Sequence, residues 1–285
     1  GVLLAKRERG HADFDVVCPS EYIVERMMRN ELLLPILTPE FEAEINEKGI
    51  NYFDCVSPYI KREFSMLTAP EGQDPNDYAV GYMWGTTGIL YNADYVTEEE
   101  ALSRDLMFNP RLKDKLLVKD AFRDVYSPIL IYAKTIEARK AGELGEDEML
   151  PLETIHDLMY DSSDESIALV ESYLKRAKEL VAGWEADFGK EMMTQEKAWI
   201  NLMWSGDAVW AIEEAAEVDV NLAYAVPREG SVVWFDGWVI PKYAKNERAA
   251  RYFIDYMCMP ENAIRNMDAT GYVSVVTNEE VLENI

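Results

Sequence analysis

Three short segments place carboxylates beside a tryptophan or at a turn, each after an apolar run. They are residues 203–207 (Met-Trp-Ser-Gly-Asp), 234–236 (Trp-Phe-Asp) and 120–124 (Asp-Ala-Phe-Arg-Asp). The face of a tryptophan ring attracts cations through its quadrupole, and a nearby carboxylate supplies the opposite charge. These residue types therefore predict a cage for an organic ammonium ion.

The chain as a whole is strongly acidic. It has 28 Lys and Arg against 53 Asp and Glu, which gives a formal net charge of −25. Such a field repels nucleic acid and anionic membranes and concentrates cations, so we expect no nucleic-acid partner. A surface that is acidic only for solubility explains the same charge equally well.

The composition is that of a packed globular protein. With 285 residues, 48% of them hydrophobic, the chain can form one large domain or two ordinary ones. No apolar run reaches the roughly 18–20 residues that a membrane-spanning helix needs. Residues 1–9 lack the layout of a secretory signal peptide.

Metal and cofactor motifs are missing from the sequence. The three cysteines, Cys18, Cys55 and Cys258, are widely spaced, and there are only two histidines. This pattern does not predict a zinc site. No glycine-rich phosphate loop, dinucleotide fingerprint or hydrolase nucleophile motif occurs either. We therefore expect no cofactor and no metal.

Strand-like and helix-like segments alternate along the chain. We expect strands at residues 14–18, 78–84, 116–118, 222–226 and 232–235, and helices at 123–140, 166–181, 194–203 and 247–257. This alternation is typical of the α/β class with sheets rich in parallel strands. In such sheets ligands bind at the carboxyl ends of strands.

Seven stretches, in order over nearly the whole chain, carry a resemblance to a known family. They are residues 15–22, 82–88, 109–117, 120–124, 203–208, 227–241 and 270–272. Each motif alone is weak, but their order and spacing together are specific. The chain resembles the spermidine/putrescine-binding proteins, the extracytoplasmic receptors of polyamine ABC transporters.

The resemblance implies a two-lobe periplasmic-binding-protein fold of type II. Lobe one is expected at residues 1–86 and 234–276, and lobe two at 87–233 and 277–285, with a hinged cleft between them. The implied protein is not an enzyme. It captures a polyamine in the periplasm, or outside the cell on a membrane anchor, and delivers it as a monomer to a membrane permease.

Compared with the family, the chain is expected to be truncated at both ends. The family begins about 30 residues earlier, with a strand and an aromatic loop that helps to enclose the ligand, and it continues through further helices. Within the matching part, Ala186 and Ala121 stand where the family has a serine and a second acid.

Asp236, Trp234 and Trp204 are the first three candidate ligand-binding residues. Asp236 would pair with a ligand ammonium, although a helix cap or an exposed turn is the alternative. The two tryptophans would flank the methylene chain and face the ammonium. Core packing is the alternative for both rings, and we assign Trp238 to the core.

Four further residues complete the candidate site. Asp124 would hold the other end of a diamine, and Asp120 would assist it or cap a helix. Acids are also common at helix N-termini for reasons of the helix dipole alone. Tyr22 would act through its hydroxyl group or have only a structural role, and Tyr272 matches the family's site tyrosine.

Two other function classes remain open at this point. Aromatic residues beside paired carboxylates also occur in glycosidases, where two acids flank the sugar bond. A sensory module that binds the same ligand and signals to a kinase would have the same sequence features.

Overall fold

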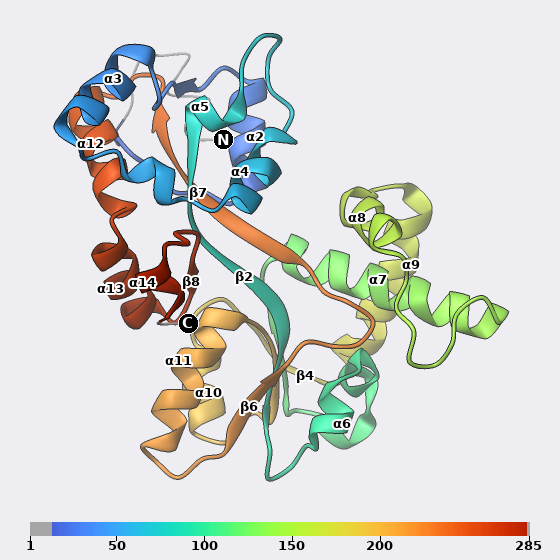
Figure 1. The fold of residues 1–285 in the computed structure, drawn as a ribbon. Helices are drawn as coiled ribbons and strands as arrows, with labels where there is room; N and C mark the ends of the chain where they lie inside the picture. Colours follow the sequence, from blue (N-terminus) through green and yellow to red (C-terminus); the bar gives the residue numbers. More distant parts are fainter. Residues whose placement is uncertain (1–12, 284–285) are drawn as a thin grey trace. The chain divides into compact units, whose positions relative to one another are not determined.

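The computed structural model describes residues 13–283, which form two compact units (Figure 1). Unit 1 contains the described residues up to Trp84 and those from Trp234 onward, and unit 2 is Gly85–Val233. The segment at residues 1–9 lies outside the described part. The described residues from 277 onward were expected in the second lobe, but they belong to unit 1. The reason is that Val281 is buried in the same core as Val56.

Unit 1 combines helices with short antiparallel strands. Its helices are α2 (Glu21–Arg29), α3 (Pro39–Lys48), η1 (Tyr52–Cys55), α4 (Pro58–Ser65), α5 (Pro75–Tyr78), α12 (Glu247–Met257), α13 (Pro260–Thr270) and α14 (Glu279–Leu282). Its strands are β1 (Leu33–Leu34), the first part of β2 (Ala79–Asn92), nearly all of β7 (Val233–Pro241) and β8 (Val273–Ser274). β1 pairs with β7 and β8 pairs with β2, both antiparallel.

Local sequence signals explain where the helices of unit 1 begin and end. Helix α3 starts after Thr38, whose hydroxyl accepts a hydrogen bond from the Phe41 backbone N–H, with Pro39 at the first helical position. It ends at Gly49, which has a φ of 67°. Glycine adopts this left-handed conformation without steric cost, so the chain can turn there.

Strand β7 separates a core face from a part-exposed face. Phe235 and Val239 are buried in the core of unit 1, and Phe235 packs edge-on against Phe64 with ring centroids 4.9 Å apart. The opposite face carries Trp234, Asp236 and Trp238, all of intermediate exposure. Because side chains alternate along a strand, burying Phe235 directs Asp236 away from the core.

Unit 2 is built around a mixed sheet. Its strands are the second part of β2, β3 (Leu116–Lys119), β4 (Val181–Glu185), β5 (Ile200–Trp204) and β6 (Leu222–Ala225). Its helices are α6 (Glu98–Ala101), η2 (Arg104–Phe108), η3 (Pro110–Leu112), α7 (Phe122–Ala141), α8 (Leu152–Tyr160), α9 (Asp164–Lys178), α10 (Gly189–Thr194) and α11 (Ser205–Ala216). Helix α7 packs against α8 and α9, and α10 packs against α11 (Figure 1).

The pairing of the strands in unit 2 departs from the expected parallel-rich sheet. Only β3 runs parallel to its neighbours β4 and β5, whereas β2 pairs antiparallel with β5 and β6. The α/β class predicted from the sequence is confirmed. The preference for parallel pairing was wrong because alternating elements do not specify the direction in which each strand returns.

Two of the expected elements differ in the structure. Residues 194–203 were predicted as a helix, but Ile200–Trp204 is strand β5, buried along most of its length. Short apolar runs do not distinguish a buried strand from a helix. The strand expected at 14–18 is reduced to a single antiparallel bridge between Val17 and Val239.

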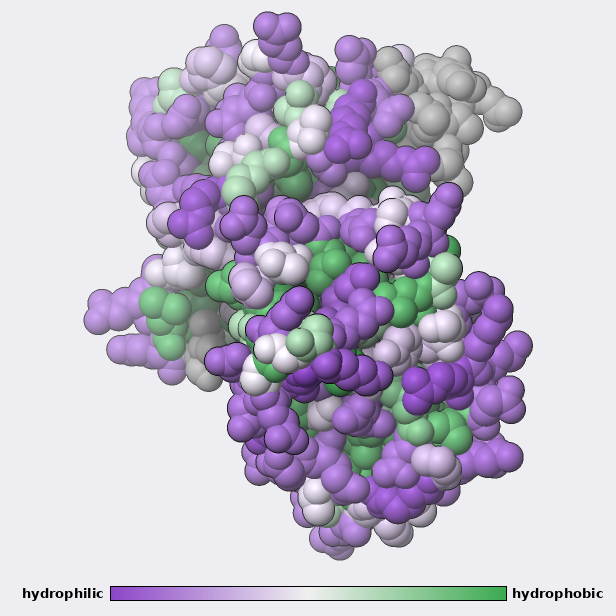
Figure 2. All heavy atoms as spheres, turned by 90° about the vertical axis from the view of Figure 1, so that its right-hand side faces the viewer, coloured by the Kyte–Doolittle hydropathy of each residue, from purple (hydrophilic) through white to green (hydrophobic). Residues whose placement is uncertain are grey.

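Hydrophilic residues dominate the visible surface. The face drawn in Figure 2 is mostly hydrophilic, with smaller hydrophobic areas between the polar side chains. No helix in the part of the chain that the structure describes is both long and apolar enough to cross a membrane.

Gly88 of β2 lies against Tyr224 and Ala225 of β6, and we expect Gly88→Ala to destabilise the protein. A Cβ atom at this position would lie 2.5 Å from Tyr224 Cζ and 2.6 Å from the carbonyl oxygen of Ala225, which is fixed by the sheet. Overpacking of this kind costs about 1–3 kcal/mol in the free energy of unfolding, measurable by urea denaturation. At Gly183 the nearest atom would be 3.5 Å away. Equal losses from Gly88→Ala and Gly183→Ala would contradict this account.

Candidate functional site

The candidate residues of unit 1 form one group, which we call the unit 1 cluster: Tyr22, Trp234, Asp236 and Tyr272. Asp236 forms an isolated antiparallel bridge with Ser20, the residue that precedes helix α2. The next residue of β7, Gly237, donates its backbone N–H to the Pro19 carbonyl at 3.0 Å. The start of α2 is therefore held beside Asp236, and Tyr22 lies in its first turn, 37% exposed.

The end of helix α13 brings Tyr272 to Trp234. Gly271 ends the helix with a φ of 72°, and the Tyr272 backbone N–H then donates to the Thr270 hydroxyl at 3.3 Å. The rings of Tyr272 and Trp234 meet edge-on, with centroids 5.3 Å apart and planes at 68°. Two residues that are 38 positions apart in the printed sequence thus form one aromatic surface.

Two aromatic residues beside Asp236 were not among the predicted site residues. Trp238 packs partly against the core, as expected, but it also shares the Asp236 face of β7. Its ring lies 4.7 Å from that of Tyr82, whose hydroxyl donates to Asn266 Oδ1 at 3.1 Å. The alternation 234, 236, 238 along a strand was the sequence signal that could have found Trp238.

The surroundings of Asp236 are partly desolvated. Burial raises the pKa of the Cys18 thiol well above its usual value, and the negative charge of Asp236 raises it further. Burial also raises the pKa of the Tyr82 hydroxyl, with smaller contributions from Cys18 and Asp236. Both groups are therefore neutral at physiological pH, and Asp236 is the negatively charged group beside them.

The candidate residues of unit 2, Asp120, Asp124 and Trp204, lie where parallel strands end. Lys119 is the last residue of β3, Glu185 of β4 and Trp204 of β5. Because β3 runs parallel to both neighbours, these three strand ends meet at one edge of the sheet. We call Asp124, Trp204 and the charged side chains around them the unit 2 cluster.

Asp124 and Trp204 are directly linked. Asp124 lies in the first turn of α7, and the indole N–H of Trp204 donates a hydrogen bond to its carboxylate. Burial raises the pKa of Asp124, while the Trp204 hydrogen bond and the charge of Lys119 lower it in part. Asp120 does not join them: it is exposed, and its side chain makes no hydrogen bond or ion pair with the described residues.

A buried lysine, absent from the sequence prediction, completes the unit 2 cluster. Lys119 is only 1% exposed, and its ammonium lies 4.2 Å from the centroid of the Trp204 ring. It also lies 3.0 Å from Glu185 Oε1 and 3.4 Å from Asp207 Oδ2. One face of Trp204 is therefore already occupied by a cation that belongs to the protein.

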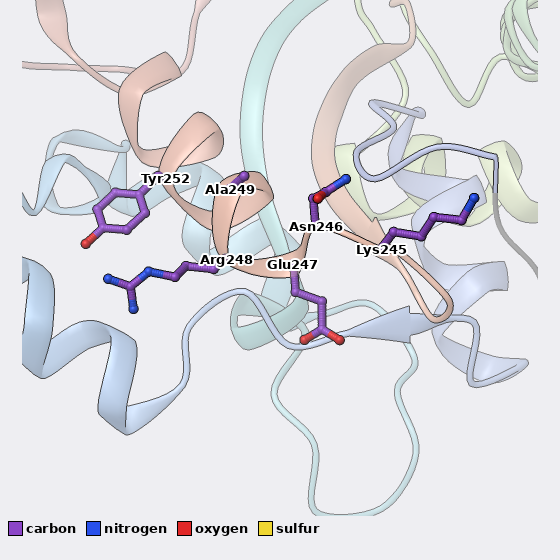
Figure 3. Close-up of a pocket in the computed structure, with 6 residues that line it drawn as sticks. All are labelled: Lys245, Asn246, Glu247, Arg248, Ala249 and Tyr252. Carbon is purple, nitrogen blue, oxygen red and sulfur yellow. The ribbon is translucent and has the colours of Figure 1, made fainter.

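A separate pocket of about 630 Å³ lies in unit 1 at the start of α12 (Figure 3). Its lining residues are Lys245, Asn246, Glu247, Arg248, Ala249 and Tyr252. It contains none of the candidate residues, and its charged groups are two cations and one carboxylate. We do not expect it to bind an ammonium ion.

The family of the chain is established by comparison with known proteins. A family model described as bacterial extracellular solute-binding protein matches residues 4–283. The chain belongs to this family. The resemblance inferred from the seven sequence stretches is thereby confirmed, and the family is one of binding proteins.

Several relatives of this chain carry names that specify polyamines. The spermidine/putrescine-binding periplasmic protein of Escherichia coli K12 is 26% identical over 260 residues, which cover 91% of this chain and 62% of that protein. The chain thus spans less than two-thirds of that relative's length. The putrescine-binding periplasmic protein PotF of the same strain is 27% identical over 303 residues, covering 99% of this chain and 72% of that protein.

A solved structure confirms the expected fold class. The spermidine/putrescine ABC transporter substrate-binding protein PotD from Streptococcus pneumoniae matches with a TM-score of 0.68 at 25% identity. The match covers 99% of this chain and 76% of that chain. The fold is therefore the periplasmic-binding-protein fold predicted from the motifs.

We predict that Trp204→Phe raises the pKa of Asp124 further. Phenylalanine keeps an aromatic face for Lys119 but removes the N–H that stabilises the Asp124 carboxylate. A carboxyl group whose pKa is raised by folding makes the protein less stable as the pH rises through that pKa. The variant should therefore lose more stability over that range than the parent protein.

The measurement is a carboxyl-carbon NMR titration of Asp124. Trp210→Phe is the matched control, because the Trp210 ring stacks on a different ammonium, that of Lys190, at 5.0 Å. It should leave the Asp124 titration unchanged. If Trp204→Phe also leaves it unchanged, the hydrogen bond between Trp204 and Asp124 does not exist in solution.

Proposed function

We propose that this chain is the ligand-binding part of an extracytoplasmic receptor that captures a linear polyamine, spermidine or putrescine. The receptor would act as a monomer in the periplasm, or outside the cell on a membrane anchor. It would deliver the polyamine unchanged to the membrane permease of an ABC transporter. Binding and release, and not catalysis, would be its activity.

The observation that carries the proposal is a tryptophan–carboxylate pair in each unit. Trp234 and Asp236 share the part-exposed face of β7, and Trp204 donates its N–H to Asp124. Each pair offers an aromatic face for methylene groups and a partly desolvated carboxylate for an ammonium. Each cluster thus has the chemistry to hold one ammonium group.

Two further observations support a cationic ligand. The net charge of −25 raises the local concentration of cations and slows the approach of anions. The relatives reported above carry names that specify spermidine or putrescine. The net charge alone would attract any cation, so the tryptophan–carboxylate pairs are what make the proposal specific for an organic ammonium.

Isothermal titration tests the proposal directly. The chain should bind 1,4-diaminobutane or spermidine and fail to bind 1,4-butanediol, which keeps the carbon chain but lacks both ammonium groups. Higher salt should weaken the long-range attraction and leave the short-range contacts in place. Binding of inorganic phosphate or a neutral sugar, with no response to any amine, would rule the proposal out.

We expect Asp236→Asn to lower the affinity for the amine roughly thirtyfold or more, because one partner of a desolvated charge pair is removed. Asp268→Asn on α13 is the control within the same unit, since Asp268 is exposed. It should change the affinity by less than about threefold. Circular dichroism must show both variants folded. Small and equal effects would exclude Asp236 from the site.

A further inference from the structure

Two segments connect unit 2 to unit 1, and a buried arginine lies near both of them within unit 2. Unit 2 begins at Gly85 and ends at Val233, and we call residues 85–87 the first connection and residues 231–233 the second. Arg104 is 0% exposed, and burial lowers the pKa of its guanidinium to about 10, so the group stays charged at neutral pH. A buried charge is tolerated only when it is paired and hydrogen-bonded. The partners of Arg104 therefore show which parts of the chain it holds in place.

These partners lie on the residues that lead into the second connection. The guanidinium donates one N–H to the Gly230 carbonyl at 2.6 Å and another to the Ser231 hydroxyl at 3.2 Å. Glu229 is 1% exposed, and its Oε2 lies 4.0 Å from Nη1 of Arg104. The other carboxylate oxygen of Glu229 accepts a hydrogen bond from the Ser103 hydroxyl at 2.6 Å. One buried side chain thus contacts three consecutive residues.

Ser231 joins the second connection to the first. Its hydroxyl donates a hydrogen bond to the Thr87 carbonyl, and the Thr87 backbone N–H donates to the Val232 carbonyl at 3.2 Å. Two neighbouring residues of one connection therefore bind both backbone polar groups of a single residue in the other. The connections are fastened to each other inside unit 2.

Two further hydroxyl groups hold the first connection against the rest of unit 2. Tyr224 of β6 donates its hydroxyl to the Thr86 carbonyl at 3.1 Å, and the Thr86 backbone N–H donates to the Ser205 hydroxyl, also at 3.1 Å. Thr87 is the strand partner of Trp204 where β2 pairs with β5. The first connection is therefore fixed directly beside the strand end that carries Trp204.

We propose that Arg104 is a positioning residue which, together with Ser231 and Tyr224, holds the two connections as one rigid part of unit 2. We call these three side chains the clamp, and all of them lie within unit 2. Buried hydrogen bonds that share partners reinforce one another, and such regions open less readily than the rest of a fold. Bending of the connections is then confined to the unit 1 side of Thr86 and Val232, and the unit 2 cluster moves together with the clamp.

Amide hydrogen exchange of the ligand-free chain, followed residue by residue by NMR, tests the clamp. Ser231→Ala removes the hydroxyl that links Arg104 to Thr87, so exchange of the Thr87 amide should become about tenfold faster. The amide of Asn92, at the far end of β2, donates to the Trp199 carbonyl at 2.9 Å. Its exchange should change by less than about twofold, because opening at the connections is local.

Ser127→Ala is the matched control for Ser231→Ala. Ser127 is 5% exposed, and its hydroxyl also donates to a backbone carbonyl, that of Met159, at 3.4 Å. This bond joins α7 to α8 and contacts neither connection. The control should therefore leave exchange of the Thr87 amide within about twofold of the wild-type rate.

Arg104→Lys separates the charge of Arg104 from its geometry. Lysine keeps a positive charge beside Glu229, but its single nitrogen replaces the planar fork that binds Gly230 and Ser231 together. Exchange of the Thr87 amide should become about fivefold faster than in the wild-type chain.

Tyr224→Phe tests the clamp without changing a charge. The variant removes the hydroxyl that holds Thr86, so the Thr86 amide should exchange about fivefold faster. Tyr126→Phe is its control, because the Tyr126 hydroxyl donates to the Asp161 carbonyl at 2.9 Å, outside both connections. It should leave the Thr86 amide within about twofold.

Faster exchange at Thr87 with little change at Asn92 in Ser231→Ala supports the inference. Equal acceleration at both amides overturns it, because Ser231 would then stabilise unit 2 as a whole, and so does unchanged exchange at Thr87. If Ser231→Ala or Arg104→Lys does not fold, Tyr224→Phe decides by the same comparison of Thr86 with Asn92. No ligand is present in these measurements, so their failure leaves the proposed function untouched.

Discussion

A fully buried ammonium group has to be neutralised inside the fold, and Lys119 imposes this requirement on unit 2. The parallel strands β3, β4 and β5 end together and bring Glu185 and Trp204 to the lysine, and helix α11 adds Asp207. Desolvation makes each of these contacts necessary, because an unpaired buried charge lowers the stability of the fold by roughly several kcal/mol. The orientation of Trp204, and through it the environment of Asp124, follows from that constraint.

Unit 1 positions its carboxylate by a different means. Strand β7 has one face in the core, so its register fixes which side chains remain accessible. The backbone bridge from Asp236 to Ser20 then holds the start of α2 at the same place. A slip of one residue would bury Asp236 and expose Phe235. The core packing of Phe235 against Phe64 therefore protects the register on which the candidate site depends.

The fold alone does not select the ligand, because one fold can carry many different sites. In the function proposed above, the choice lies with the side chains of the two clusters, which combine aromatic faces with carboxylates. The overall charge of −25 acts at longer range and steers any cation toward the chain. Within the unit 2 cluster, Lys119 and Lys190 offset the charges of Glu185 and Asp207.

The amino-acid sequence by itself determined the α/β class and the family, and it indicated most of the candidate site residues. Trp234, Asp236 and Asp124 could be proposed because strand alternation and helix-start acids are local patterns. The tertiary structure decided that Asp120 is exposed, that residues 200–204 form a strand, and that Lys119 is buried under Trp204. The physical reason is that burial and charge pairing depend on which distant strands become neighbours. A lysine has the same formal charge in the sequence whether its side chain is exposed to water or buried between two carboxylates.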